Sequence, residues 1–260
     1  QEALNMKEIK VLWMYHDIMD LYGDKGNMLV LTQRCHKRGI GITIDTCGIG
    51  EQRDMRDYDL LFLGGGADRE QMMLMDDLRA RRENIAQAMA EKSFVFLVCG
   101  GYQLFGQYYI AADGSRIDGL GFFEYYTESG ANGTRCIGNI AVECTLDGRK
   151  ITAVGFENHG GQTRNVKTPL GKVLHGCGNT FQDGMEGFYQ GQVFATYMHG
   201  PLLPKNPDIA DFMIVKALQK KHPQIGPDDL SPLDDTLEHQ AKNAMLRRLG
   251  VPEVPYEFKG

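Results

Sequence analysis

Short apolar runs alternate with longer amphipathic segments in the first hundred residues. Four short runs predict strands, at residues 9–15, 42–46, 59–63 and 94–98, and all but the second are largely apolar. Between them, residues 25–38 and 68–92 repeat apolar side chains at helical spacing, and the first of these helices should stop at Gly39. Short apolar strands separated by helices are typical of a parallel sheet that helices cover on both faces. The pattern predicts an α/β fold with a mostly parallel central sheet.

The pattern changes between residues 114 and 196. Glycine becomes frequent, and short β-like stretches appear at residues 140–146, 151–156 and 193–196. We interpret this part of the chain as an antiparallel extension of the same sheet rather than as a new domain.

Two helices are expected to close the chain. The first begins near Asn206-Pro207, because proline suits the first helical position. The second begins at Ser231-Pro232, where Asp234 stands three residues after the serine, as in a capping box. Its apolar residues form a stripe that must be buried: Leu233, Leu237, Ala241, Ala244 and Leu249. We therefore predict an α/β domain at residues 7–204 and a C-terminal helical extension at residues 205–260, which packs on the domain or on a partner.

The composition is that of a soluble globular protein, with 42% hydrophobic and 24% charged residues. The net charge of −6 offers no electrostatic attraction for nucleic acid or an anionic membrane. No apolar run approaches the roughly 20 residues of a membrane span, and Gln1–Asn5 lacks a signal pattern, so neither membrane insertion nor export is expected. Six cysteines without a C-x-x-C pair favour a reducing, cytoplasmic compartment, in which most of them are small buried hydrophobic residues.

One cysteine has a different context. Residues 94–103 read F-V-F-L-V-C-G-G-Y-Q, so a buried strand runs directly into Cys99, two glycines follow, and a helix then begins. This is the pattern of a nucleophile elbow, in which a tight turn presents a side chain at the carboxyl end of a sheet. Amides at the start of the following helix would favour the thiolate. The alternative is a buried structural cysteine, but the double glycine favours a nucleophile.

A thiolate that attacks an amide needs a group to protonate the leaving nitrogen. His199 also follows a predicted strand, and Gly200-Pro201 turns the chain away after it. Loops after parallel strands gather at one edge of a sheet, so Cys99 and His199 are expected to meet there. His159 is the one serious rival among the other histidines.

The reaction also needs backbone donors for an oxyanion. Gly64-Gly65-Gly66 follows the third strand, and we assign the Gly65 and Gly100 amides to this role. The alternatives for three glycines are an ordinary turn or a nucleotide loop. No G-x-G-x-x-G opens a helix here, and residues 23–27 do not form a Walker loop, so nucleotide binding is weakly supported.

Several motifs together resemble the class I, triad-type glutamine amidotransferases, in their cobyric-acid-synthase-like branch. They are C-G-G-Y-Q at 99–103, G-G-G at 64–66, E-N-H-G-G at 157–161 and Y-M-H-G-P at 197–201. Three longer motifs resemble the glutaminase subunits of that branch that work with a MurT-like Mur ligase: residues 21–27, 134–139 and 199–207. The resemblance covers roughly residues 7–210. It implies a flavodoxin-like α/β fold with Cys99 as nucleophile and His199 as its base.

The resemblance also implies two substrate contacts. Arg135 would hold the α-carboxylate of free glutamine, and an arginine fork suits a carboxylate. Gln103, in the cysteine loop, is a second candidate for binding the same amino acid.

The chain departs from the family pattern at two positions. Leu97 stands where many relatives have glycine, two residues before the nucleophile, and Pro201 stands where the third triad member, a glutamate, usually follows the histidine. A catalytic imidazole needs an acceptor on its other nitrogen. Either a carboxylate in this chain, such as Glu157, supplies it, or a partner does. The resemblance favours an aspartate of the partner.

We therefore expect a glutamine-hydrolysing subunit whose ammonia passes to a MurT-like ligase, which amidates the D-glutamate of lipid II in peptidoglycan synthesis. No cofactor is expected in this chain, since ATP and Mg²⁺ would belong to the partner. Three alternatives stay open: an amidotransferase for a corrinoid-type acceptor, a cysteine peptidase of the same fold, and a non-catalytic regulatory subunit.

Overall fold

The computed structural model describes Leu4 and residues 7–258, so most of Gln1–Asn5, for which we expected no signal pattern, lies outside the described residues. Six strands form the central sheet in the order β13-β14-β4-β3-β1-β2. All neighbours pair in parallel except β13, which is antiparallel to β14. The bounds are β1 Glu8–Met14, β2 Gly41–Cys47, β3 Leu60–Leu63, β4 Phe94–Val98, β13 Phe188–Gln190 and β14 Val193–Thr196. The five parallel strands follow the flavodoxin-like order, which confirms the predicted fold class.

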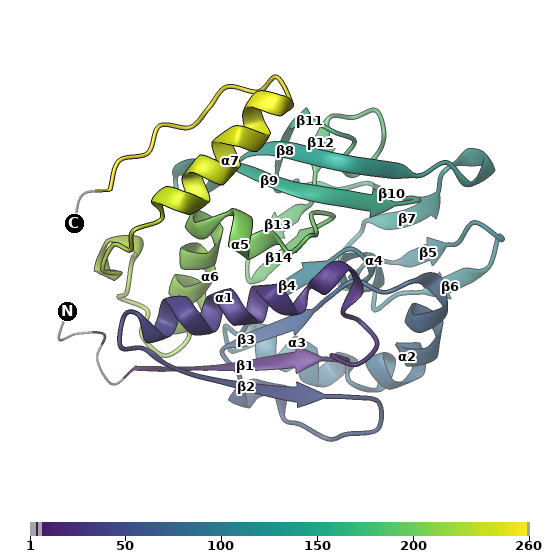
Figure 1. Cartoon of the computed structure of the whole chain (residues 1–260). Helices are drawn as coiled ribbons and strands as arrows, with labels where there is room; N and C mark the ends of the chain where they lie inside the picture. The colour runs from purple at the N-terminus through teal and green to yellow at the C-terminus, as the bar shows by residue number, and fades with distance from the viewer. Residues whose placement is uncertain (1–3, 5–6, 259–260) are drawn as a thin grey trace.

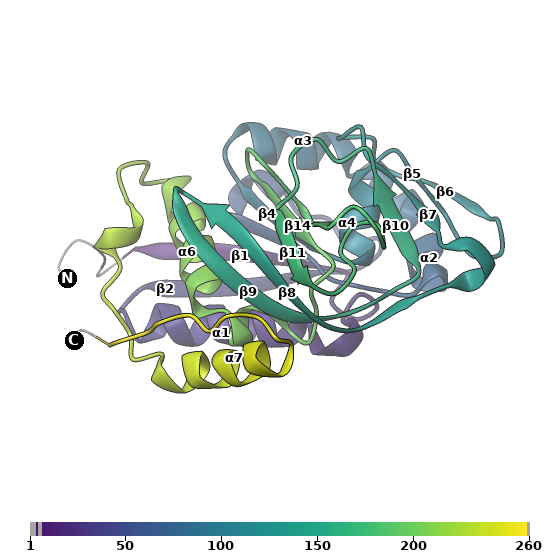
Figure 2. The same ribbon diagram turned by 90° about the horizontal axis from the view of Figure 1, so that it is seen from above.

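Helices cover both faces of this sheet, as Figures 1 and 2 show. On one face, α1 (Lys25–His36) and α6 (Pro207–Gln219) pack against each other and against the strands. On the other face lie α2 (Asp68–Ala80) and α3 (Arg82–Ala90), which divide the single predicted helical segment at Arg81. Gly39 follows α1 with a φ of +69°, in the left-handed conformation expected where a helix stops.

The prediction that residues 114–196 extend the central sheet is confirmed for β13 and β14 and is wrong for the strands before them. Those strands instead build two separate four-stranded sheets, with orders β10-β7-β5-β6 and β12-β11-β8-β9. Their strands are β5 Tyr108–Ile110, β6 Arg116–Asp118, β7 Tyr126–Ser129, β8 Cys136–Leu146, β9 Arg149–His159, β10 Gly161–Arg164, β11 Gly171–His175 and β12 Met185–Glu186.

The long hairpin of β8 and β9 explains this difference. Both of its central turn residues, Asp147 and Gly148, have positive φ, as in the tight turns that join antiparallel strands. The two strands therefore pair with each other along their whole length and need no place in the central sheet. Figure 2 shows the hairpin passing over the central strands.

The last helix differs from its prediction. The helix α7 spans Thr236–Arg248, so it begins after Ser231, and no capping side chain bonds at its start. The carboxylate of Asp234 instead accepts from the amide and hydroxyl of Thr236. The predicted apolar stripe is also wrong, because Leu237 is 76% exposed. The buried residues of the helix are His239, Lys242 and Leu246.

The first C-terminal helix begins at Pro207, as predicted, and packs against β1 and β4. The division into residues 7–204 and 205–260 stays a prediction. The shorter helices are η1 Leu21–Gly23, η2 Met55–Asp57, α4 Gly100–Phe105, η3 Ala131–Gly133, α5 Leu202–Lys205 and η4 Pro227–Asp229. Across the part of the chain that the structure describes, no helix has the length and hydrophobicity needed to cross a bilayer.

Candidate active site

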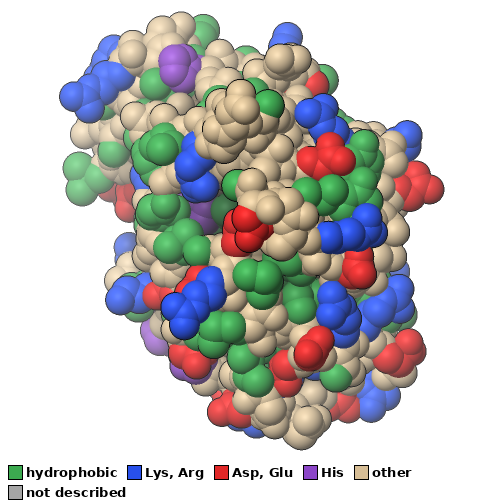
Figure 3. Space-filling view, turned by 90° about the vertical axis from the view of Figure 1, so that its right-hand side faces the viewer, with side chains coloured by type: hydrophobic (Ala, Val, Ile, Leu, Met, Phe, Trp, Pro, Cys, Tyr) green, Lys and Arg blue, Asp and Glu red, His purple; other side chains and the backbone are tan. Residues whose placement is uncertain are grey.

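The parallel strands β1, β3, β4 and β14 end on the side of the molecule that Figure 3 shows. In an open α/β sheet, ligands bind beyond these carboxyl ends, next to the point where the strand order reverses. Here the order reverses between β1 and β3. Acidic and basic side chains are interspersed on this face, and neither charge forms a continuous patch (Figure 3).

Cys99 stands between the buried strand β4 and the short helix α4. Its φ of 50° and ψ of −102° are disfavoured for a residue with a side chain, as expected of a nucleophile elbow. Its amide donates to the carbonyl of Thr196 at 2.8 Å, which fixes the turn to β14. The turn also requires glycine at position 101, because a Cβ there would lie 2.5 Å from the Leu63 carbonyl oxygen. Cys99 is 6% exposed and lines a cavity of about 420 Å³.

His199 lies beyond the end of β14, beside Cys99. A two-way backbone bridge to Phe156 of β9 holds it there. Both side chains flank Gly65: a Cβ at Gly65 would lie 2.6 Å from His199 Cε1 and 3.4 Å from Cys99 Cβ. The structure thus brings the predicted nucleophile and base together, and it needs a glycine between them.

The carboxylate beside His199 is Asp24. Its Oδ1 lies 3.3 Å from His199 Nδ1, and its Oδ2 accepts from the Gly65 amide at 2.9 Å. Neither side chain is exposed to solvent. Asp24 directly precedes α1 in the loop that follows β1, so it reaches the point of strand-order reversal. We did not single it out from the sequence. The usable signal was an acidic residue in the loop between the first strand and the first helix, since loops after later strands of the same sheet carry Cys99 and His199.

The electrostatic interactions of His199 with Cys99 and Asp24 favour the charged form of its imidazole. Burial opposes the imidazolium, but the negative charges of Cys99 and Asp24 outweigh this cost and raise the pKa of His199 to about 10. Nε2, the other ring nitrogen, has no hydrogen-bond partner of ordinary geometry within the described chain. The arrangement provides a buried proton donor beside a sulfur nucleophile.

The two other candidates for these roles, Glu157 and His159, contact each other rather than His199, although His159 lines the same cavity as Cys99. Glu157 is buried and accepts from the amides of Cys177 and Gly178. Its remaining contact is with His159 Nε2, at 3.3 Å. Glu157 therefore does not orient His199, and the structure pairs the rival histidine with Glu157.

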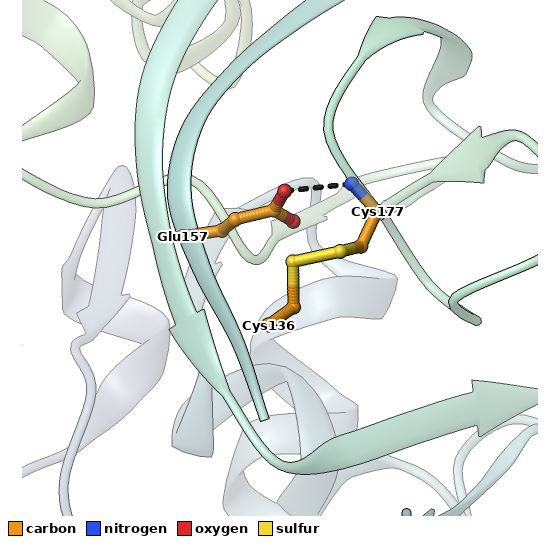
Figure 4. A group of neighbouring side chains, drawn as sticks. All are labelled: Cys136, Glu157 and Cys177. Atoms are coloured by element: carbon orange, nitrogen blue, oxygen red, sulfur yellow. Dashed lines mark hydrogen bonds between the residues drawn. A yellow bond between two sulfur atoms is a disulfide. The ribbon is translucent and has the colours of Figure 1, made fainter. Parts of the chain in front are cut away.

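Cys136 and Cys177 form a disulfide beside Glu157, as Figure 4 shows. This pairing differs from our interpretation of the cysteines, which favoured a reducing compartment and small buried hydrophobic roles for most of them. The two residues are 41 positions apart: Cys136 begins β8, and Cys177 follows β11, which pairs with β8. Apart from Cys99, the free cysteines are Cys35, Cys47 and Cys144, which are buried thiols, as expected of small hydrophobic residues. The two sulfurs and the carboxylate form the one cluster of metal-ligand type in the described residues, and its sulfurs are bonded to each other.

Arg135 lines the same cavity as Cys99. Its guanidinium donates to the side-chain oxygen of Asn158, at 2.9 Å from Nη2 and 3.3 Å from Nε, and to the Asn158 carbonyl oxygen at 3.3 Å. It is exposed, so a carboxylate in the cavity could replace these neutral acceptors. The role of Arg135 in binding glutamine stays a prediction.

Gln103 also lines the cavity, but both ends of its amide are bonded to the protein. Its nitrogen donates to the Tyr197 hydroxyl at 3.2 Å, and its oxygen accepts from Gln71 at 3.1 Å. It shapes the cavity in this state, and direct contact with substrate stays a prediction.

The glycine loop is arranged differently from the expectation. The single hydrogen of the Gly65 amide is used by Asp24, whereas Gly66 lines the cavity. Gly100 is the first residue of α4, where an amide has no carbonyl a turn earlier to bond. The assignment of Gly65 and Gly100 as oxyanion donors stays a prediction, and Gly66 is a further candidate.

Known proteins resemble the chain over most of its length. Residues 10–207 match the model of the CobB/CobQ-like glutamine amidotransferase domain. The chain is 37% identical over 243 residues to "Lipid II isoglutaminyl synthase (glutamine-hydrolyzing) subunit GatD" of Staphylococcus aureus strain N315, covering 94% of this chain and 97% of that protein. The protein of the same name from Streptococcus pneumoniae strain R6 is 38% identical over 219 residues, covering 84% of this chain and 83% of that protein.

A solved structure supports the same fold. A crystal structure of a glutamine amidotransferase aligns with 79% of this chain and 98% of its own, with a TM-score of 0.51 and 14% identity. The family match, the two relatives and the flavodoxin-like sheet agree. The chain belongs to the CobB/CobQ-like glutamine amidotransferase family.

Proposed function

We propose that this chain is the glutaminase subunit of a lipid II isoglutaminyl synthase. It hydrolyses L-glutamine to glutamate and ammonia, and a MurT-like ligase uses the ammonia to amidate the D-glutamate of lipid II. The names of the two relatives, which match most of the chain, support this acceptor over a corrinoid. In this proposal ATP and Mg²⁺ belong to the ligase, and both subunits work in the cytoplasm, where free glutamine and ATP are available.

The proposed chemistry uses Arg135, Cys99 and His199 in turn. Glutamine binds with its α-carboxylate on Arg135, and Cys99 Sγ attacks the side-chain carbonyl carbon, which moves an electron pair onto the amide oxygen. Protonated His199 gives its proton to the leaving nitrogen, so ammonia departs and a γ-glutamyl thioester remains. Water then attacks the thioester while His199 takes a proton from it. Glutamate leaves, and the thiolate and imidazolium are restored.

One observation carries the proposal: His199 lies between Asp24 and Cys99, at a cavity that Arg135 also borders. We assign Asp24 as the orienting carboxylate, because its contact with His199 Nδ1 leaves Nε2 available for the sulfur and the substrate. This assignment competes with our expectation that an aspartate of the ligase completes the triad.

Glutaminase assays on the isolated chain and on its complex with the ligase separate the two assignments. If Asp24 orients His199, the isolated chain hydrolyses glutamine, and Asp24→Asn lowers kcat by about 10²- to 10⁴-fold with or without the ligase. If the ligase supplies the carboxylate, the isolated chain is nearly inactive, and Asp24→Asn changes little in the complex. Asp17→Asn, an exposed carboxylate in the same loop, is the control.

The acceptor is tested with the complete complex. With glutamine and ATP present, mass spectrometry of lipid II should show replacement of one carboxyl group by an amide, and Cys99→Ala should abolish the change. Hydrolysis of glutamine without any amidation of lipid II would contradict the acceptor while leaving the glutaminase assignment intact. Cleavage of peptides in the absence of glutamine would instead favour a peptidase.

A further inference from the structure

Tyr22 packs over the catalytic histidine. Its ring meets the His199 ring edge to face, with centroids 5.2 Å apart and an interplanar angle of 76°. It also contacts the ring of Phe156, at 6.2 Å. Tyr22 itself is 41% exposed, whereas His199 is fully buried. With Gly65 beside its Cε1 and Tyr22 on another side, the imidazole has little freedom to leave Asp24.

The backbone of Tyr22 is held in a conformation that tyrosine rarely adopts. Its φ of 57° and ψ of 26° lie in the left-handed region, which costs a residue with a side chain about 1–3 kcal/mol. Such a conformation persists only where surrounding contacts hold it. One such contact is next to it, since the Leu21 amide donates to the Gly65 carbonyl at 3.0 Å. The loop that carries Tyr22 is thus tied to the glycine loop of the site.

The hydroxyl of Tyr22 is connected through Asn158 to Arg135, the predicted substrate-binding arginine. It accepts a hydrogen bond from the side-chain nitrogen of Asn158. The oxygen of the same amide accepts from Arg135 at 2.9 Å. One amide group therefore connects Tyr22 to Arg135, while the ring of Tyr22 contacts His199. All of these except the imidazole line one cavity with Cys99.

We propose that Tyr22 is a positioning residue with two separable actions. Its ring keeps the His199 imidazole on Asp24, and its hydroxyl, through Asn158, sets the orientation in which Arg135 receives the carboxylate of glutamine. This inference rests on the proposed function. It adds that Tyr22, in the loop after β1, links the binding of the glutamine carboxylate at Arg135 to the position of the His199 imidazole.

The two actions predict different kinetic effects. Tyr22→Phe keeps the ring and loses the hydroxyl, so KM for glutamine should rise about 3- to 10-fold while kcat stays within about twofold. Tyr22→Ala also removes the ring, so kcat should fall at least about 10-fold. A residue with a merely structural role would lower the amount of folded enzyme without separating KM from kcat. Tyr108→Phe, a half-buried tyrosine on β5 that does not line the cavity, is the matched control.

Labelling of Cys99 by 6-diazo-5-oxo-norleucine, a glutamine analogue, gives a second readout that needs no ligase. Saturation kinetics yield an inhibition constant, which reports binding, and a maximal rate, which reports chemistry at Cys99. We expect Tyr22→Phe to weaken the inhibition constant alone and Tyr22→Ala to lower the maximal rate. Equal effects of both variants on the maximal rate, or an unchanged inhibition constant in Tyr22→Phe, would overturn the inference. If the wild-type chain is not labelled, the proposed function fails, and this inference fails with it.

A double-mutant cycle tests the link through Asn158. Asn158→Ala and Tyr22→Phe both remove the same connection, so the double variant should bind glutamine no more weakly than Asn158→Ala alone. Losses that add in the double variant would show that the hydroxyl acts by another route and would overturn the inference. Thermal unfolding of each variant confirms that the chains compared are folded.

Discussion

Cys99 occupies a backbone conformation that its own side chain disfavours, and we expect this strain to lower stability measurably. Glycine at position 99 would relieve about 1–3 kcal/mol of strain and lose about 0.5–1 kcal/mol through its flexible unfolded backbone. Cys99→Gly should therefore be more stable than Cys99→Ala by about 1 kcal/mol, or about 2–4 °C in Tm. Thermal unfolding of the two inactive variants measures this. If Cys99→Gly were less stable than Cys99→Ala, the backbone at position 99 would not be strained.

The contact of Asp24 with His199 predicts a pH dependence of stability. The fold raises the pKa of His199 from 6.5 to about 10, so the native state favours the protonated ring. This contribution is fully present below pH about 6.5 and is lost as the pH rises through about 10. Asp24→Asn removes one of the causes, so the stability advantage of the wild type over this variant should be largest near pH 6.

Urea unfolding of both proteins between pH 6 and pH 10 provides the measurement. The difference in their free energies of unfolding should shrink as the pH rises. Asp17→Asn should show no such trend, since its carboxylate is exposed. A difference that stays constant or grows with pH would mean that Asp24 does not stabilise the charged imidazole.

At the scale of elements, α7 shows how tertiary packing selects the buried face of a helix. Leu246 lies in a small apolar cluster with Ala141 and Val154 of the β8–β9 hairpin. Lys242 is buried as well, because its ammonium group lies 3.3 Å from the Asp208 carboxylate. Of the predicted stripe, Leu237, Ala241 and Ala244 face solvent instead, whereas Leu249 packs against the edge of this cluster.

Because α7 buries Leu246 and exposes Leu237, we predict unequal effects of alanine substitutions at these two leucines. Leu246→Ala should lower the free energy of unfolding by about 2–4 kcal/mol, because it removes buried contacts and leaves a cavity. Leu237→Ala should change it by less than about 0.5 kcal/mol. Chemical denaturation of the isolated chain decides between them. The reverse order would support the stripe expected from the sequence, and equal losses would show that neither face is preferred.

At the scale of the whole molecule, a buried ion-pair network joins the C-terminal segment to the first helix. Arg34 of α1 bonds the carboxylates of Asp211 in α6 and Asp235 just before α7. Arg38 also binds Asp211, and it donates to the Ser231 carbonyl. Residues about 200 positions apart in the sequence are therefore held together.

The network predicts that the chain unfolds in one step. Trp13 fluorescence, which reports on β1, and far-UV circular dichroism, which reports on all helices, should give coincident transitions. Arg34→Met should lower stability by about 3 kcal/mol, since it leaves the Asp235 carboxylate without its arginine and Asp211 with Arg38 alone. Arg56→Met, which removes an exposed pair with Asp54, should cost less than about 1 kcal/mol. An earlier loss of helical signal would instead show that residues 205–260 unfold as a separate unit.

The sequence by itself determined the parallel sheet and the positions of its reactive ends. Apolar runs such as residues 94–98 must be buried on both faces, and the glycines after Cys99 permit a turn that few other residues allow. These are local constraints, so they can be read without knowing the neighbours. They placed Cys99 and His199 at strand ends, where the structure brings the two side chains together.

Only the tertiary structure decided the partners of those residues. Asp24 reaches His199 from 175 positions away, the disulfide joins β8 of a separate sheet to the loop after β11, and α7 turns a partly polar face inward. Each of these depends on which elements become neighbours after the chain has folded. Buried charges and hydrogen-bond donors find their partners among residues that are distant in the sequence. The hydrophobic pattern indicates which elements form, but not which polar residues will pair.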